Sequence, residues 1–309
     1  MDKSNSKIIV ILGPTACGKS VLAVNLAKKV NGEIISADSR QIYKGLDIGS
    51  GKVPNTEVGL PYIYKGVIHH LFDVASPKRT FTVAQYQKLA KKTIKGIIKK
   101  GKIPIICGGT AFYIYSLIYN WQLPKVPPQK KLRKKLEKKS SQELFEQLKK
   151  LDPKRAKNID RYNKRRLVRA LEIVLVTKTT ISSVGTINST KNSPYRMLKI
   201  GIKKDKKELQ RLINKRLLKR LKIGMINEVK NLHKKGVNWK RLDELGLEYR
   251  YISYYLRGLL TKEQMIKTLN QKIWQFSKRQ MTWFKKDKEI NWVKSYKEAE
   301  KLTRQFLSK

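Results

Sequence analysis

The sequence predicts an α/β fold, in which a parallel sheet is flanked by helices and carries an inserted all-helical domain. Two observations predict the sheet. The apolar run 8–12 precedes a glycine-rich turn and an amphipathic stretch. The segments 32–38 and 103–107 are strand-like and end in polar residues before further helical sequence. Short buried strands that alternate with helices are typical of parallel sheets.

A change of composition at residue 123 predicts the insertion. A proline-containing linker leads into lysine-rich helical sequence, and strand-like alternation returns only at 197–202. We therefore expect residues 1–122 and 196–309 to form one core domain, and residues 123–195 to form a helical domain inserted into it. The length of 309 residues suits a core domain with such an insertion.

The glycine-rich turn after the first strand has the G-x-x-x-x-G-K-S spacing of a phosphate-binding loop, or P-loop. Its glycines allow successive N–H groups to point into one concavity. Lys19 adds positive charge at the amino end of the following helix, and the Ser20 hydroxyl is placed to bind Mg²⁺. The loop predicts a polyphosphate with its metal, without specifying which polyphosphate. The residues expected to bind this diphosphate or nucleotide are Gly13, Pro14, Thr15, Ala16, Cys17, Gly18, Lys19 and Ser20.

Asp38 follows the second predicted strand at its carboxyl end, where open parallel sheets bind ligands. A carboxylate beside a P-loop is either a partner of Mg²⁺ or a general base. Aspartate is also a common helix N-cap. The position of Asp38 alone leaves these three interpretations open.

A helix, a strand and a turn are predicted next. A helix is expected over 82–100, capped by its threonine and burying one apolar stripe. Pro104 within the strand 103–107 indicates an edge strand or an irregular ladder. In the turn 108–110, two glycines permit close approach of a ligand to the backbone. Thr110 either hydrogen-bonds a substrate or belongs to a plain strand-to-helix turn.

Neither the histidines nor the cysteines predict a metal site. His69 and His70 are adjacent on a predicted strand, so their side chains should point to opposite faces. Cys17 and Cys107 lack metal-ligand spacing and form no disulfide framework, which favours a reducing cytoplasm. No apolar run approaches the about 20 residues of a membrane span, and we expect no membrane association.

Several sequence signals predict where separate helices begin within the insertion. Ser140 and Glu143 predict a capping box, and Asp152–Pro153 predicts the start of another helix. The segment 165–172 predicts an amphipathic helix with an arginine face. We expect a polar loop over 182–195.

From Asp205 onward the sequence predicts mostly helices. Asp205 and Glu208 fit a capping box at the start of a strongly basic helix. Residues 246–250 predict a turn into another helix, and a long helix is expected over 262–286. Basic residues beside its aromatic rings can hold phosphates while rings stack on bases, but we expect most of these rings to be buried. The basic helix after Asp205 carries Arg211, Lys215, Arg216, Lys219 and Arg220. The long helix carries Trp274, Phe276, Trp283 and Phe284.

The charge is the most pronounced compositional feature. There are 70 lysines and arginines against 23 acidic residues, which gives a formal net charge of +47. Such a chain repels itself unless it works with a polyanion, and nucleic acid is the most common one. The alternative is a lysine-biased genome that decorates solvated faces without a function.

The motifs together resemble those of the tRNA dimethylallyltransferase family over nearly the whole chain. Their order and spacing are more specific than any one of them. The resemblance rests on residues 13–20, 38–43 with 46–49, 69–73, 108–110, 166–172 and 278–283.

This resemblance implies transfer of a dimethylallyl group from dimethylallyl diphosphate to N6 of adenosine 37, next to the anticodon of tRNA. The P-loop would hold the diphosphate with Mg²⁺ as cofactor. Asp38 would be the general base, and Thr110 would position the base or the diphosphate. The adenosine would be flipped out of its loop. The insertion would clasp the anticodon stem-loop, and the enzyme would be a cytoplasmic monomer.

The same resemblance implies which residues contact tRNA. They include the segment 246–250 and the basic end of the long helix. The individual residues are Asp38, Ser39, Arg40, Gln41, Thr110, Arg133, Arg165, Arg166, Leu167, Val168, Arg169, Arg250, Lys278, Arg279 and Gln280.

The chain departs from the family pattern at several positions. Gly-Tyr-Arg or Gly-Tyr-Lys usually stands where residues 246–250 read Gly-Leu-Glu-Tyr-Arg. An arginine commonly stands at Trp274. Cys17 and Ser20 replace the more frequent serine and threonine with the chemistry of the loop kept. Ser50–Gly51 replaces Thr-Ala, and we expect little consequence from it.

Two other classes of protein fit parts of the sequence. A nucleotide kinase or ATPase would use the same P-loop with Asp38 as a partner of Mg²⁺, but no apolar strand ends in the usual second acidic site. A non-catalytic RNA-binding protein would use the charge alone. Asp38→Ala separates this last class from an enzyme, because a binder would lose nothing by it.

Overall fold

The computed structural model describes residues 6–57, 61–181 and 193–309, and these divide into two compact units. Unit 1 contains Met1–Ile118 and Pro194–Lys309, and unit 2 contains Tyr119–Ser193. The predicted polar loop 182–195 lies largely outside the described residues. Among those residues, no helix combines the length and the hydropathy that a membrane span requires.

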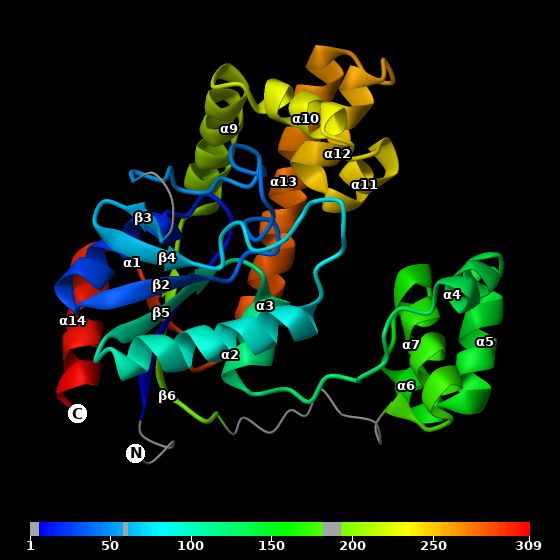
Figure 1. Ribbon diagram of the computed structural model, residues 1–309, viewed down its shortest axis with the longest axis horizontal. Coiled ribbons are helices and arrows are strands. Elements are labelled where there is room, and N and C mark those ends of the chain that lie inside the picture. The colour runs from blue at the N-terminus through cyan, green and yellow to red at the C-terminus, as the bar shows by residue number, and fades with distance from the viewer. Residues whose placement is uncertain (1–5, 58–60, 182–192) are drawn as a thin grey trace. The chain divides into compact units, whose positions relative to one another are not determined.

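A seven-stranded sheet in the order β3-β4-β2-β5-β1-β6-β7 is the centre of unit 1 (Figure 1). Every neighbouring pair is parallel except β3 with β4, which form an antiparallel hairpin. The α/β fold with a mostly parallel sheet is therefore as predicted. The strands are β1 (Lys7–Leu12), β2 (Gly32–Ser36), β3 (Tyr62–Tyr64), β4 (Val67–His70), β5 (Ile103–Gly108), β6 (Arg196–Ile202) and β7 (Asn291–Val293).

The strands form where apolar runs can be buried on both faces. Residues 8–12 of β1 are fully buried between β5 and β6. The prediction that Pro104 marks an edge strand is wrong, because β5 lies in the middle of the sheet. Its ladder with β1 starts only at Ile105, opposite Ile9, so the proline precedes this ladder and removes no hydrogen bond from it.

Helices cover both faces of the sheet. The crossovers through α1 (Lys19–Lys29) and α2 (Val83–Lys99) run in opposite directions along the sheet, so right-handed connections place the two helices on opposite faces. The predicted cap of α2 is confirmed as a capping box between Thr82 and Gln85. The ring of Tyr86 on α2 stacks at 4.0 Å on Tyr113 of α3 (Ala111–Ile118).

The chain after β6 forms a helical layer, coloured yellow to orange in Figure 1, and returns to the sheet with β7. The predicted capping box at Asp205 is wrong: Asp205 is the N-cap of the next helix, but its side chain accepts no capping hydrogen bond. Glu208 instead pairs with Lys204 at 2.8 Å. The helices between β6 and β7 are α9 (Lys206–Lys222), α10 (Met225–Lys234), α11 (Trp239–Leu245), α12 (Leu247–Leu256) and α13 (Lys262–Phe284), and α14 (Tyr296–Ser308) follows β7.

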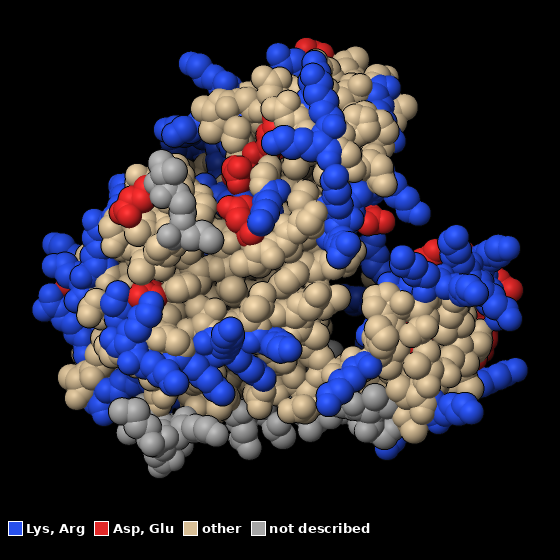
Figure 2. Space-filling view, in the orientation of Figure 1, with Lys and Arg blue, Asp and Glu red and all other residues tan. Residues whose placement is uncertain are grey.

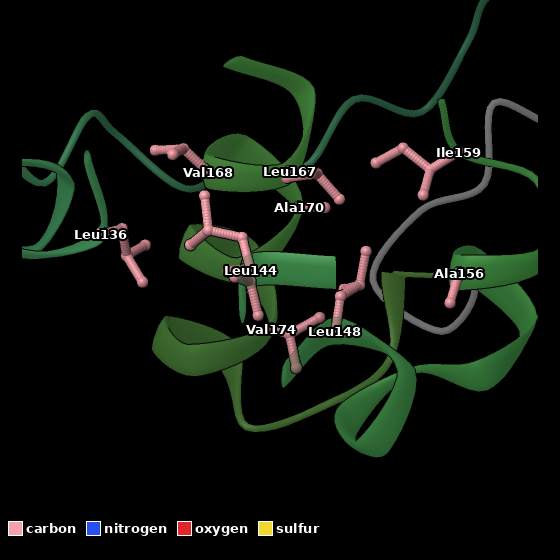
Figure 3. Packing of buried hydrophobic residues seen from close by; sticks show 10 residues of the cluster. Leu136, Leu144, Leu148, Ala156, Ile159, Leu167, Val168, Ala170 and Val174 are labelled. Carbon is pink, nitrogen blue, oxygen red and sulfur yellow. The ribbon is translucent and has the colours of Figure 1, made fainter. Parts of the chain in front are cut away.

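Unit 2 has its own hydrophobic core of leucine, isoleucine, valine and alanine side chains (Figure 3). The capping box of Ser140 with Glu143 and the helix start at Asp152–Pro153 are both confirmed. Its described helices are α4 (Lys130–Glu137), α5 (Ser141–Leu151), α6 (Pro153–Lys157) and α7 (Lys164–Thr177).

Candidate active site

The P-loop joins β1 to α1 and leaves the N–H groups at the start of α1 without a side-chain cap. Gly13 has a φ of 146° and Gly18 a φ of 97°, and Ala16 adopts a φ of 65°, so three residues leave the ordinary backbone regions within one turn. Gly18 is the N-cap of α1 without a side chain that could occupy the free N–H groups. The Lys19 ammonium lies over the loop, 2.6 Å from the Pro14 carbonyl oxygen. The result is a concave, positively polarised anion cradle.

The carboxyl ends of β2 and β5 place Asp38 and Thr110 beside this cradle. Asp38 Oδ1 accepts the Arg40 N–H at 2.8 Å, and among the described residues Oδ2 makes no protein hydrogen bond. Of the three interpretations of Asp38, the helix N-cap is wrong, because residues 39–42 form turns. Thr110 Oγ1 accepts the Ser39 N–H at 3.1 Å, and the Thr110 N–H donates to the Ala37 carbonyl. These bonds hold the loop of Asp38 on the end of β5.

Gln280 of α13 connects the P-loop to the end of β5. Its Oε1 accepts the Thr15 N–H at 2.8 Å, and its Nε2 donates to the Gly109 carbonyl at 2.8 Å. The side chain is buried, so it is not free to contact tRNA as predicted. A Cβ on Gly109 would lie 2.3 Å from Gln280 Nε2, and one on Gly108 would lie 2.2 Å from the Ala37 oxygen. The two glycines thus permit close approach by the chain itself.

Two arginines of α9 complete the cationic wall, and sequence reasoning did not assign them to the site. Arg216 Nη1 donates to Thr15 Oγ1 at 3.2 Å. Arg220 donates to the Gly49 carbonyl at 3.1 Å and pairs with Glu248 at 3.2 Å, while its buried Nη2 has no partner among the described residues. Burial and the neighbouring Arg220 charge lower the pKa of Arg216 to about 10, which leaves it charged at neutral pH. The sequence feature that could have identified this pair is their i, i+4 spacing, which places both residues on one face of the helix.

Gly51 provides the space for these two guanidinium groups. It has a φ of 66°, and a Cβ there would lie within 2.1 Å of Nη2 of both Arg216 and Arg220. The departure Ser50–Gly51, expected to have little consequence, therefore determines how closely the arginines approach the loop. Glu248, another departure, supplies the carboxylate that partly neutralises Arg220.

These groups line one cavity of about 710 Å³ in unit 1. Cationic groups, the Asp38 carboxylate and an apolar wall share it, as a charged ligand with an apolar part requires. Lining residues are Thr15, Ala16, Gly18, Lys19 and Ser20; Asp38, Ser39, Arg40 and Gln41; Gly108, Gly109 and Thr110; Arg216, Lys219 and Arg220; and, in the apolar wall, Phe72, Leu245, Leu247, Ile273 and Phe276.

Some of the predicted tRNA contacts line this cavity, and others are exposed elsewhere on the surface of unit 1. Arg40 and Arg250 are half-buried and line it, whereas Lys278 and Arg279 of α13 are exposed. The Gln41 side-chain amide is hydrogen-bonded within the chain. Its Oε1 accepts from Ser36 Oγ, and its Nε2 donates to the Gly51 carbonyl.

The prediction that most aromatic rings of α13 are buried is wrong. Among its four tryptophan and phenylalanine rings only Phe284 is fully buried, and Trp283 is 44% exposed. Trp274 is half-buried under the Lys278 ammonium, which lies 5.9 Å from the ring centroid. The rings of this helix are therefore partly available at the surface.

The arginines predicted in unit 2 divide into two groups. Arg165 and Arg166 are exposed, whereas Arg133 and Arg169 both bind the buried Glu172 carboxylate, at 2.7 Å and 2.5 Å. Leu167 and Val168, also predicted to contact tRNA, are 0% and 4% exposed in the core of unit 2 (Figure 3). Their side chains belong to one hydrophobic cluster with leucines of α4 and α5, so the structure removes them from the proposed contacts.

The adjacent histidines form no metal site. His69 Nδ1 bonds the Val67 carbonyl oxygen and its ring stacks on Phe72, while His70 Nε2 bonds Glu33 at 2.7 Å. In the described part of the chain no group of three histidine, cysteine, aspartate or glutamate side chains is placed to hold a metal.

Basic side chains are spread widely over the visible face of the molecule, and acidic ones are sparse (Figure 2). On α2 the exposed lysines include Lys88, Lys92, Lys95 and Lys99, and burial together with the neighbouring Lys95 ammonium lowers the pKa of Lys91. This distribution favours a polyanionic partner.

Comparison with known proteins gives a consistent result. The family model for IPP transferase matches residues 41–287. A tRNA dimethylallyltransferase of Halothermothrix orenii is 38% identical over 315 aligned residues, covering 98% of this chain and 94% of that protein. One of Acetivibrio thermocellus is 41% identical over 291 residues, covering 93% and 91%.

Solved structures that are similar to this chain are proteins of the same kind. A tRNA Δ(2)-isopentenylpyrophosphate transferase of Staphylococcus epidermidis superposes with a TM-score of 0.70 at 35% identity, covering 98% of this chain and 100% of that one. A eukaryotic dimethylallyltransferase, described as acting on tRNA, gives a TM-score of 0.74 at 27% identity, covering 90% and 70%.

Proposed function

The chain belongs to the IPP transferase family, and on that premise we propose that it transfers a dimethylallyl group from dimethylallyl diphosphate to N6 of adenosine 37 in tRNA. The observation that carries the proposal is the shared cavity. One space holds an anion cradle, a carboxylate with a free oxygen and an apolar wall. A kinase needs the first two of these, whereas a prenyl donor uses all three.

The P-loop and α9 bind the diphosphate in this account. N–H groups at the start of α1 and the ammonium of Lys19 face the phosphates. The Arg216 guanidinium of α9 lies beside Thr15 of the same loop. Negative charge grows on the diphosphate as the bond between its oxygen and C1 of the dimethylallyl group breaks. Fixed donors aimed at that charge stabilise the transition state more than the ground state.

Mg²⁺ fits the donor set and is part of the proposal. Ser20 lies in the first turn of α1 and lines the cavity, so its hydroxyl would hold the ion together with phosphate oxygens and water. Mg²⁺ commonly binds through few protein ligands and substrate phosphates. Bound there, it would neutralise charge on the leaving diphosphate.

Asp38 acts as the general base. Its Oδ1 is held by the Arg40 N–H, which leaves Oδ2 to accept a proton from the N6 amine. The nitrogen lone pair forms the bond to C1, the electron pair of the C1–O bond leaves with the diphosphate, and the N6 proton moves to Asp38. Thr110 is a positioning residue, because it fixes the backbone of Ser39 next to that carboxylate.

The target adenine reaches the cavity only when it is flipped out of its stack. The exposed cations Lys278 and Arg279 of α13, and Arg165 and Arg166 of unit 2, would hold the backbone of the anticodon stem-loop. We also propose a cytoplasmic monomer, as the family resemblance implies, and the two free cysteine thiols are consistent with a reducing compartment.

A labelled-donor assay tests this proposal. The protein is incubated with tRNA and Mg²⁺, once with dimethylallyl-labelled dimethylallyl diphosphate and once with γ-labelled ATP. We expect label to enter tRNA from the first donor and no tRNA-dependent turnover of the second. Turnover of ATP without prenyl transfer would make the protein a phosphoryl-transfer enzyme, and binding of tRNA without either reaction would make it a non-catalytic binder.

A further inference from the structure

Tyr162 is the most exposed large apolar side chain that the structure describes, at 74% of its surface. It directly precedes Asn163, the N-cap of α7. A large side chain at this position usually packs back on the helix residue four positions beyond the cap, here Leu167. Leu167 is fully buried in the core of unit 2 without it, so the ring of Tyr162 is left outside.

Local contacts hold this exposed ring in place. Asp160 Oδ1 accepts the Tyr162 N–H at 3.1 Å, which fixes the turn. The Arg161 guanidinium donates to the Tyr162 hydroxyl at 2.7 Å, and its carbon lies 4.9 Å from the ring centroid. A tyrosine held by a turn and paired with a guanidinium loses less conformational entropy when a planar ligand stacks on it.

The surroundings of Tyr162 favour an anionic partner. The first turn of α7 contains Lys164, Arg165 and Arg166 and no acidic residue, although the positive end of a helix favours acids there. Residues 119–193 contain 20 lysines and arginines against 6 acidic residues. The residues of this first turn go against the local preference, as is typical of functional sites, and the acid of α7, Glu172, pairs with Arg133 and Arg169 instead.

We infer that Tyr162 stacks on an unpaired nucleobase of the tRNA substrate, while Arg165 and Arg166 hold neighbouring phosphates. The inference rests on the proposed function and adds a binding residue to it. An aromatic plane with an adjacent guanidinium and phosphate-binding cations is the usual combination for unpaired bases. An acidic peptide would match the charge but makes no use of the ring.

The test is RNA binding by the full chain, with the anticodon stem-loop of a substrate tRNA as the probe. Loss of one stacking contact in Tyr162→Ala should weaken binding about tenfold. Tyr162→Phe keeps the ring and should bind within about twofold of wild type. Because no phosphate contact is lost, the slope of log affinity against log salt should stay unchanged in both variants.

Tyr64→Ala is the matched control, since Tyr64 in unit 1 also carries a cation, Lys65, at 5.6 Å from its ring. It should bind RNA like wild type. The inference is overturned by normal RNA binding of Tyr162→Ala, by equal losses in the Ala and Phe variants, or by a loss accompanied by a shallower salt slope.

Prenyl transfer separates this inference from the proposed function. Tyr162→Ala should transfer dimethylallyl groups at near the wild-type kcat once RNA is saturating. A fall in its kcat at saturating RNA would overturn the inference while leaving the proposed function intact. If the wild-type chain itself transfers none, the proposed function fails whatever Tyr162 binds.

Discussion

Asp38 has its two carboxylate oxygens in different environments, and this difference makes a sharp variant possible. Asp38→Asn keeps an acceptor for the Arg40 N–H and so keeps the turn, but it removes the base. We expect kcat to fall at least about 100-fold, the usual contribution of a general base, with RNA affinity within about twofold of wild type. Single-turnover transfer and RNA titration measure the two quantities. Near-normal kcat in this variant would remove Asp38 from the chemistry.

Gln280 connects two loops through two hydrogen bonds, and its removal leaves both partner groups unpaired. Gln280→Ala should lower the free energy of unfolding by about 2 kcal/mol and raise the KM for dimethylallyl diphosphate, since the Thr15 N–H lies in the P-loop. Urea unfolding and steady-state kinetics measure these changes. Gln275→Ala, an exposed glutamine on the same helix, is the control and should change stability by less than about 0.5 kcal/mol. Equal effects of the two substitutions would contradict the assigned role of Gln280.

At this scale the sequence predicted local chemistry better than long-range partners. The P-loop residues and Asp38 were predicted from their spacing along the chain, and Lys19, Ser20 and Asp38 line one cavity. The tasks of Gln280 and Arg216 depend on contacts 265 and 201 residues away, with Thr15. The periodicity of a sequence contains no information about contacts between residues so far apart in the chain.

Helices α4 and α7 are joined by the buried Glu172 carboxylate. Burial raises the pKa of Glu172, but hydrogen bonds from Arg133, Arg169 and the Gln129 N–H together lower it below the ordinary range. A carboxyl with a depressed folded pKa stabilises the fold above its unfolded pKa, and this contribution is lost as pH falls through the folded value. The predicted tRNA contacts Arg133 and Arg169 thus have a structural task.

Glu172→Gln should therefore destabilise unit 2 by about 3 kcal/mol at pH 7, because two arginines lose their charged partner. The difference in free energy of unfolding between wild type and variant should decrease as pH falls below about 4. Hydrogen exchange of the α4 and α7 amides measures it. The exposed Glu137 on α4 is the control: Glu137→Gln should change little at any pH. A gap that stays constant down to pH 2 would rule out ionic coupling through Glu172.

Element types followed from the sequence, but environments did not. Strands β1, β2, β5 and β6 and helices α2 and α13 lie within a few residues of their predicted positions, because apolar periodicity marks them. The central position of β5 and the exposure of Trp283 depend on which elements pack nearby. Sequence pattern alone carries no information about that packing.

The whole molecule is a polycation, and its RNA affinity should depend steeply on salt. If about six phosphates are neutralised, log affinity should fall against log salt with a slope of about −4 to −5. Lys278→Gln with Arg279→Gln should reduce that slope by about 1.5. Lys297→Gln with Lys301→Gln, exposed on α14 and outside the cavity, should leave it unchanged. A slope that responds equally to both pairs would mean that the charge acts as a diffuse field without a defined binding face.

At the scale of the molecule, the order of the motifs predicted the family, and the charge favoured nucleic acid as the partner. They did not predict that the cationic wall of the cavity comes from α9, an element that follows the insertion in the chain. The fold creates that wall by returning the chain to β6, beside β1.

Mass spectrometry of tRNA after reaction with dimethylallyl diphosphate and Mg²⁺ tests the central claim most directly. We expect the adenosine 3′ to the anticodon to gain one C₅H₈ unit on N6, and the Asp38→Asn protein to leave it almost entirely unmodified over the same reaction time. An unchanged adenosine with the wild-type protein, or the same gain with Asp38→Asn, would contradict it.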